Sequence, residues 1–138
     1  MQPADSNEQK RRLVNLLWLW LPVAVQMGLI FYFSAQPKGS PALESSPLPA
    51  GLGHLVGYAI LGFLLYRAFN GGINGWSNPA GWKSFIVGLL YAVSDEIHQL
   101  YVPGREASVT DVGIDAAGLL LALTVIWVKE AVNKNIKG

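Results

Sequence analysis

The run from Leu13 to Phe33 most constrains the fold, because its 21 residues include no charged side chain. About 20 apolar residues in a helix cross a hydrocarbon core of roughly 30 Å, whereas the apolar core of a signal peptide is roughly 7 to 15 residues. Phe33, Ser34 and Ala35 also make a poor small-residue cleavage site. The run therefore predicts a retained membrane helix, with a bend at Pro22.

The rest of the chain predicts three more helices, separated by segments rich in Pro, Gly, Asn and Ser. With 51% hydrophobic and 14% charged residues, the chain is too apolar for an ordinary soluble domain. We expect an all-α fold, a bundle of four transmembrane helices in one domain over residues 13–128, with polar tails at 1–12 and 129–138. The further helices are expected at 52–69, at about 83–101, and from Thr110 or Asp111 to Val128, with loops at 34–51 and 70–81.

Lys and Arg residues indicate how such a bundle would be oriented. Cytoplasmic segments carry an excess of basic residues. With both termini inside, only Lys38 and Arg105 lie outside. We therefore expect a multi-pass protein of the bacterial cytoplasmic membrane with cytoplasmic termini. The basic residues then inside are Lys10, Arg11, Arg12, Arg67, Lys83, Lys129, Lys134 and Lys137.

The polar stretch from Ser94 to Arg105 interrupts the third expected helix. Ionisable residues at membrane depth cost a few kcal/mol each and usually mark a functional site, although they can also hold helices together. At about 100° per residue, Ser94, Asp95, His98 and Gln99 share the face turned toward the bundle, with Glu96 at its border.

The expected topology brings polar residues of all four helices to the extracytoplasmic face. Asp111 has a second interpretation, because Asp is a common N-terminal cap. Asp115 lies one turn deeper and is expected to point at the helix over 83–101. Gly118 and Ala122 are expected to allow close helix packing. The converging residues are Tyr32, Ser34, Gln36, His54, Tyr58, Asp95, Glu96, His98, Gln99, Asp111 and Asp115.

Arg105 lies in the turn between the two acid-bearing helices. It either neutralises one of the nearby acids or holds a phosphate, since a guanidinium makes planar two-point bonds to phosphate oxygens.

Several other chemistries find no support in the sequence. The chain has no cysteine, no basic arm typical of nucleic-acid binding, and no nucleotide loop, dinucleotide fingerprint or GxSxG elbow. His54, His98 and the four nearby acids offer possible ligands for a divalent cation, but no HExxH or comparable spacing is present, so no metal ligand and no cofactor are assigned.

Three motifs resemble the VanZ-like family of small bacterial membrane proteins: FYFSAQP, HLVGYAILG and SDEIHQLYVPGREASVTDVGIDAAG. The resemblance covers roughly residues 13 to 128 and implies a four-helix membrane protein, linked through the family's namesake to low-level teicoplanin resistance. It implies no mechanism. Asp115 stands where the family more often has Asn, which favours a metal or a shared proton at that position.

Two functions remain open from the sequence. The first is a cell-envelope enzyme acting on a lipid or lipid-linked headgroup, such as a cell-wall carrier or a phospholipid. In it Asp95, Glu96 and His98 supply acid and base chemistry, and His54 is a second proton-transfer group or a nucleophile. The alternative is a non-catalytic protein that binds or shields lipid-linked cell-wall precursor. Residues expected to bind the substrate are Arg105, Gln99, Asp111, Asp115, Ser34, Gln36 and Tyr58.

Overall fold

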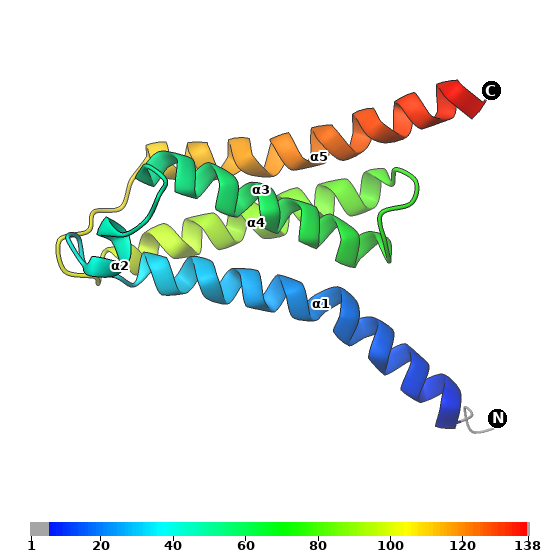
Figure 1. Ribbon diagram of the computed structural model, residues 1–138, viewed down its shortest axis with the longest axis horizontal. Helices are drawn as coiled ribbons and strands as arrows, with labels where there is room; N and C mark the ends of the chain where they lie inside the picture. The colour runs from blue at the N-terminus through cyan, green and yellow to red at the C-terminus, as the bar shows by residue number, and fades with distance from the viewer. Residues whose placement is uncertain (1–5, 138) are drawn as a thin grey trace.

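The computed structural model describes residues 6–137, and all regular structure in that range is helical. Four long helices lie side by side and a short helix interrupts the first loop (Figure 1). The helices are α1 (Ser6–Ser34), α2 (Pro41–Glu44), α3 (Ala50–Asn70), α4 (Asn78–Gln99) and α5 (Val109–Lys137). Residues 1–5 and 138, the ends of the two expected tails, lie outside the described residues.

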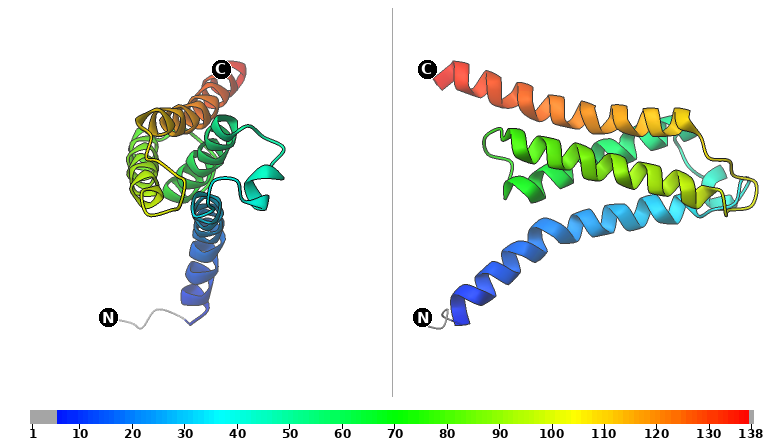
Figure 2. Two further views of the ribbon diagram at one scale, coloured as in Figure 1. Left: turned by 90° about the vertical axis from the view of Figure 1, so that its left-hand side faces the viewer. Right: turned by 180° about the vertical axis from the view of Figure 1, so that it is seen from behind.

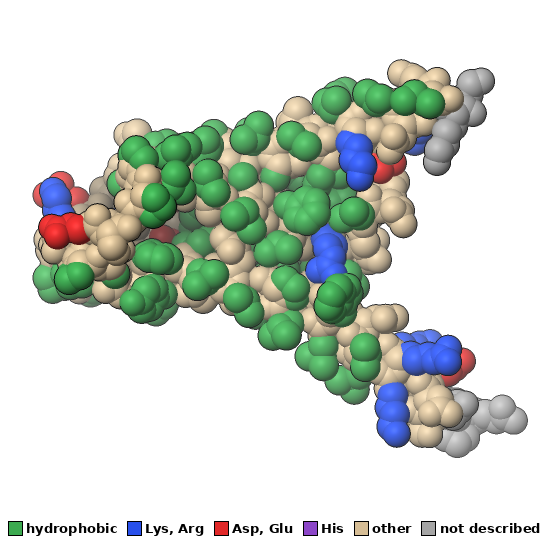
Figure 3. Space-filling view, in the orientation of Figure 1, with side chains coloured by type: hydrophobic (Ala, Val, Ile, Leu, Met, Phe, Trp, Pro, Cys, Tyr) green, Lys and Arg blue, Asp and Glu red, His purple; other side chains and the backbone are tan. Residues whose placement is uncertain are grey.

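Three helices, α1, α3 and α5, are long and apolar enough to cross a membrane. Large hydrophobic side chains cover much of the face shown in Figure 3. The exposed ones of the described chain include Trp18, Leu90 and Val125, which are 72%, 64% and 59% exposed. Such a surface suits lipid, because apolar side chains facing hydrocarbon need no further burial. The protein is therefore a membrane protein. The α4 helix has 22 residues, but polar side chains near its end lower its hydropathy.

The α3 helix is the centre of the bundle and packs against α1, α4 and α5. Its contact with α5 is close because Gly118 has no side chain: a Cβ there would lie 2.4 Å from the carbonyl oxygen of Leu55. Leu119, the next residue, is fully buried and packs against Gly62 of α3 and Gly88 of α4. The expected small-residue contact at Gly118 is thus present, and it sets the spacing of these helices.

The α1 helix contains Pro22 and bends, so that its N-terminal part leaves the bundle (Figure 2). A helical proline has no N–H to donate to the carbonyl four residues earlier, here that of Trp18. Arg67 of α3 donates from Nη1 to this carbonyl at 3.2 Å, and its guanidinium lies 5.4 Å from the centre of the Trp18 ring. The bend is therefore stabilised by a residue of a neighbouring helix.

All four long helices begin earlier than expected, at Ser6, Ala50, Asn78 and Val109, and capping explains the last two starts. The α4 helix starts at Asn78 because the Ser77 hydroxyl accepts from the Ala80 N–H and Pro79 lies in the first turn, where a missing N–H costs nothing. The α5 helix starts at Val109, and the Ser108 hydroxyl accepts from the Asp111 N–H at 3.2 Å. Asp111 is therefore in the first turn and does not cap the helix.

Both described chain ends lie at the same end of the bundle (Figure 1), and most Lys and Arg side chains gather toward that end (Figure 3). The opposite end carries α2 and the turn between α4 and α5. The polar residues singled out from the sequence lie toward this opposite end.

Candidate functional site

A cavity of about 380 Å³ lies between α1, α3 and α4 at the end opposite the termini. One part of its wall is apolar and includes Leu29, Ile30 and Phe33 of α1, while the α3 and α4 residues supply polar groups. A Cβ on Gly53 would meet nothing within 4 Å, so this residue leaves the cavity open. The polar side chains that line it are Gln26, Ser34, Ser46, His54, Tyr58, Asp95, Gln99 and Arg105.

His54 of α3 forms an ion pair with Asp115 of α5, with 3.0 Å between Nδ1 and Oδ1. The His54 side chain is 17% exposed and Asp115 is fully buried. With Asp115 ionised, its carboxylate only accepts hydrogen bonds, so Nδ1 donates, and in the neutral imidazole Nε2 keeps a lone pair. Asp115 thus points at α3 rather than at α4, because the close approach of α3 and α5 at Gly118 places His54 nearest to it.

Asp95 lies close to Ser34 and Gln99. Three buried oxygens of the cavity lining nevertheless form no hydrogen bond of ordinary geometry: Asp95 Oδ1, Ser34 Oγ and Tyr58 OH. Asp95 is 3% exposed, Ser34 5% and Tyr58 1%. Buried polar groups are nearly always satisfied, and an unpaired one costs about 1 to 3 kcal/mol. These oxygens at the wall of one cavity can therefore accept or donate a better hydrogen bond with a ligand.

Glu96 is buried on the same helix but faces another group of residues. Its Oε1 accepts from Gln99 at 3.2 Å and its Oε2 from the Ser108 N–H at 2.7 Å. Ligand atoms of Glu96, His54 and Asp111 all lie within 4.8 Å of one another. Three helices therefore bring an imidazole and two carboxylates together, which makes this group a candidate cation site.

Arg105 lines the cavity and is held against the end of α1. Its Nε donates to the carbonyl of Gln36 and its Nη2 to that of Phe33, each at 3.1 Å. Cations are favoured at helix C-termini, where carbonyls lack partners. Within the described part of the chain Arg105 forms no salt bridge with an acid, so the expectation that it neutralises one receives no support. Donors on both terminal nitrogens remain for a ligand.

The observed phase of α4 differs from the expected one. Glu96, expected at the border, is buried with Asp95 and Gln99, whereas Ser94 is exposed and its hydroxyl donates to the Tyr91 carbonyl. The reason is that Gly88 and Ala92, the small residues of α4, pack against the bundle and fix the buried face.

His98 and Gln36 do not line the cavity. The His98 ring packs on Phe31 with 4.5 Å between ring centres, and the Gln36 amide donates to the Tyr32 carbonyl of its own helix. His98 Nε2 is nonetheless buried without a partner. The structure therefore places His98 outside the cavity that His54 lines.

Some lining residues are absent from the sequence-based set. Gln26 donates to the Gly57 carbonyl at 3.0 Å. Leu43 of α2, and Ser46 and Leu48 of the loop that follows it, also line the cavity. A single amide in an apolar run is only a weak indication that Gln26 lines a cavity. Nothing in a loop rich in Pro and Ser indicates where it docks, because that depends on the tertiary fold.

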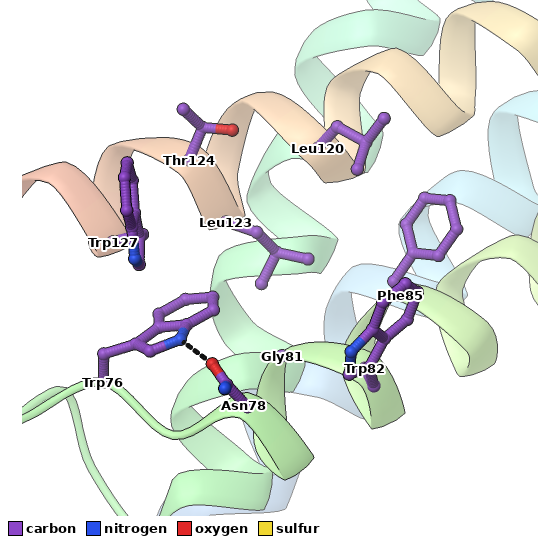
Figure 4. Close-up of a pocket in the computed structure, with 9 residues that line it drawn as sticks. All are labelled: Trp76, Asn78, Gly81, Trp82, Phe85, Leu120, Leu123, Thr124 and Trp127. Atoms are coloured by element: carbon purple, nitrogen blue, oxygen red, sulfur yellow. Dashed lines mark hydrogen bonds between the residues drawn. The ribbon is translucent and has the colours of Figure 1, made fainter.

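A second cavity, of about 350 Å³, lies between α4 and α5 toward the end that holds the termini. Figure 4 shows Trp76, Trp82 and Trp127 around it, with Leu123 between the two helices. Trp76 also stacks on Tyr66, and it passes directly over Gly81. No titratable residue lines this cavity. Tryptophans are enriched where membrane meets water, so this cluster fits an interfacial anchor rather than a reaction site.

No curated protein and no solved structure matches this chain. A family model, described as VanZ/LLP1, matches residues 7–130. The matched range includes all four long helices in large part, together with every residue of the polar cavity. The chain therefore belongs to the VanZ/LLP1 family.

Proposed function

We propose that this protein acts on the headgroup of a lipid or lipid-linked molecule of the bacterial cell envelope. The observation that carries the proposal is one cavity that combines an oriented histidine, a buried carboxylate and an arginine with an apolar wall. Such a cavity suits an amphipathic ligand, because its apolar wall can hold a chain while polar groups contact a headgroup.

The proposed membrane arrangement has four spans with both termini in the cytoplasm. The α4 helix packs against α3 and α5 and has a length similar to α3, which supports its spanning the same layer. The basic residues at the end with the termini support a cytoplasmic position for that end. The polar cavity then lies in the outer half of the membrane, at headgroup depth.

The proposed chemistry is proton transfer at a phosphate-containing headgroup. His54 Nε2 is the base, oriented by the buried carboxylate of Asp115 as in other carboxylate–histidine pairs. Asp95 donates or accepts a proton at the other side of the cavity, and Arg105 binds phosphate oxygens with its remaining donors. Glu96 and His98, which do not line the cavity, are the expected further acid or base groups that the experiment below tests. Gln99, Ser34 and Tyr58 are hydrogen-bonding partners of the ligand.

The test uses purified protein in lipid nanodiscs, assayed for conversion of lipid phosphates and polyprenyl phosphates by mass spectrometry. His54→Gln, Asp95→Asn, Glu96→Gln and His98→Gln are compared with Glu106→Gln, an exposed acid of the α4–α5 turn, as control. Loss of about 100-fold or more is expected for His54→Gln and Asp95→Asn, since proton transfer contributes about 10² to 10⁴. Unchanged turnover in all four variants would refute catalysis.

A non-catalytic binder gives a different result in native mass spectrometry. A retained lipid whose mass stays constant on incubation indicates binding or shielding. The unpaired oxygens of Asp95, Ser34 and Tyr58 suit either function. A contribution to glycopeptide resistance would appear as a raised minimal inhibitory concentration of teicoplanin on expression in a sensitive strain, and as its loss with Asp95→Asn.

A further inference from the structure

Four carboxylates surround His54: those of Asp95, Glu96, Asp111 and Asp115. Three of them are at least nine-tenths buried, and within residues 6–137 no Lys or Arg forms a salt bridge with any of the four. Burying uncompensated charge costs several kcal/mol per ion. His54 provides at most one positive charge, so the other buried carboxylates are neutralised either by protons or by a bound cation.

The ligand geometry of His54, Glu96 and Asp111 suits a single cation. Their ligand atoms lie within 4.8 Å of one another, and ligands with bonds of about 2.1 Å can be at most about 4.2 Å apart around one ion. Small side-chain rotations therefore suffice to bring the three atoms to one ion. Both Glu96 oxygens accept one hydrogen bond each and keep a second lone pair.

The hydrogen bonds around these residues also support a cation site, independently of the distances between the three ligand atoms. Metal-binding histidines usually donate their other ring N–H to a carboxylate, which fixes the tautomer and raises basicity. Asp115 accepts this bond from His54 Nδ1. Asp115 is fully buried, and its Oδ2, beside the imidazole, has no hydrogen-bond partner. The Ser108 N–H and the Gln99 amide hold the Glu96 carboxylate in a similar way.

We propose that His54, Glu96 and Asp111 bind one divalent transition-metal ion, of the Zn²⁺ or Mn²⁺ class, with Asp115 as the residue that positions His54. An imidazole ligand favours Zn²⁺ over Mg²⁺ and Ca²⁺, whereas carboxylates also suit Mn²⁺, and two carboxylates balance the charge of the ion. Three protein ligands leave a coordination position open, as in catalytic zinc sites. The site shares His54 with the polar cavity, so a bound ion would be adjacent to a ligand there. An ion on Nε2 would take the lone pair that the proposed proton transfer uses, so the metal-bound imidazole and the free base are alternative states of His54.

The experiment measures metal binding alone, without lipid substrate, so that its outcome is separate from that of the proposed reaction. Full-length protein is purified in detergent with an affinity tag that contains no histidine, stripped with EDTA, and titrated with ZnCl₂ or MnCl₂ by calorimetry and equilibrium dialysis. We expect saturable binding of one equivalent. His54→Gln and Asp111→Asn should each weaken binding at least tenfold, and Asp115→Asn by about 10- to 100-fold.

Glu106→Gln is the matched control, because it removes an exposed carboxylate from the adjoining turn and should bind as the wild type does. Asp111→Asn is the variant least expected to disturb the fold, since no hydrogen bond within the described chain uses the Asp111 carboxylate. Size-exclusion profiles and melting temperatures verify each variant. Absence of saturable binding of both ions to the wild type, or equal binding by Asp111→Asn, would overturn the proposal.

Discussion

At the scale of single residues, one glycine and one arginine shape the candidate site. Gly118 lets the α3 backbone approach α5, which puts Asp115 within reach of His54. Arg105 uses two hydrogen bonds on α1 carbonyls and thereby presents its guanidinium to the cavity. Both residues are needed for the site although neither is an acid or a base in the proposed reaction.

Gly118→Ala is expected to destabilise the protein by about 1 to 3 kcal/mol, because a Cβ 2.4 Å from the Leu55 carbonyl must push α3 and α5 apart. Gly113→Ala on the same helix is the control, since nothing lies within 4 Å of its Cβ, and it should be neutral or stabilising. Melting temperatures in detergent check both. Equal melting temperatures for the two variants would contradict the close contact.

Arg105→Gln should lose both bonds to the end of α1 and lower the free energy of unfolding by about 1 to 2 kcal/mol. Arg105→Lys keeps the charge but not the planar set of donors, so it should bind lipid phosphate more weakly than the wild type while losing less stability. Thermal unfolding and native mass spectrometry with a phospholipid measure the two effects. Wild-type behaviour of Arg105→Lys in both assays would argue against a phosphate clamp.

At the scale of elements, the bend in α1 determines how much of that helix touches the bundle. Beyond Pro22 toward the N-terminus, side chains such as Leu13 and Leu17 are more than half exposed, and Figure 2 shows this part diverging from α3 and α5. The C-terminal part of α1 forms the apolar wall of the cavity. One proline thus separates a wall-forming segment from a segment that faces its surroundings.

Pro22→Ala should restore the hydrogen bond to the Trp18 carbonyl, displace Arg67 from it and straighten α1. The chain has no cysteine, so spin labels on Glu8→Cys and Lys134→Cys report one distance without background. Electron paramagnetic resonance should give a shorter distance in Pro22→Ala. Val25→Ala, an exposed site on the same helix, serves as control and should leave the distance unchanged.

At the scale of the whole molecule, the proposed topology places the two ends of the bundle on opposite sides of a membrane. Single cysteines at Lys38, Asn74, Glu106 and Lys134 test it with a membrane-impermeant thiol reagent on intact cells. Labelling is expected at Lys38→Cys and Glu106→Cys only, because these sites lie at the end opposite the termini. Because Asn74 and Glu106 flank α4, labelling of both would show that α4 does not span.

Much of the fold follows from apolar runs and turn residues. The four long helices occur where such runs were expected, and the family is confirmed by the match over residues 7–130. The early starts of α4 and α5 could also have been predicted from the sequence, because both follow local capping patterns. These are Ser77 followed by Pro79, and Ser108 three residues before Asp111. The number of spans and their orientation stay predictions.

The sequence by itself determined the helices and the end of the bundle at which polar residues meet, because hydropathy, helix length and helix direction are local or additive properties. Only the tertiary structure decided which of those residues face one another. Asp115 contacts His54, Glu96 lies near Asp111, and His98 is set apart on Phe31. The physical reason is that close contacts at glycines set the rotation of each helix about its axis and the distance between helices. A rotation of a few tens of degrees changes every partner on a helix face.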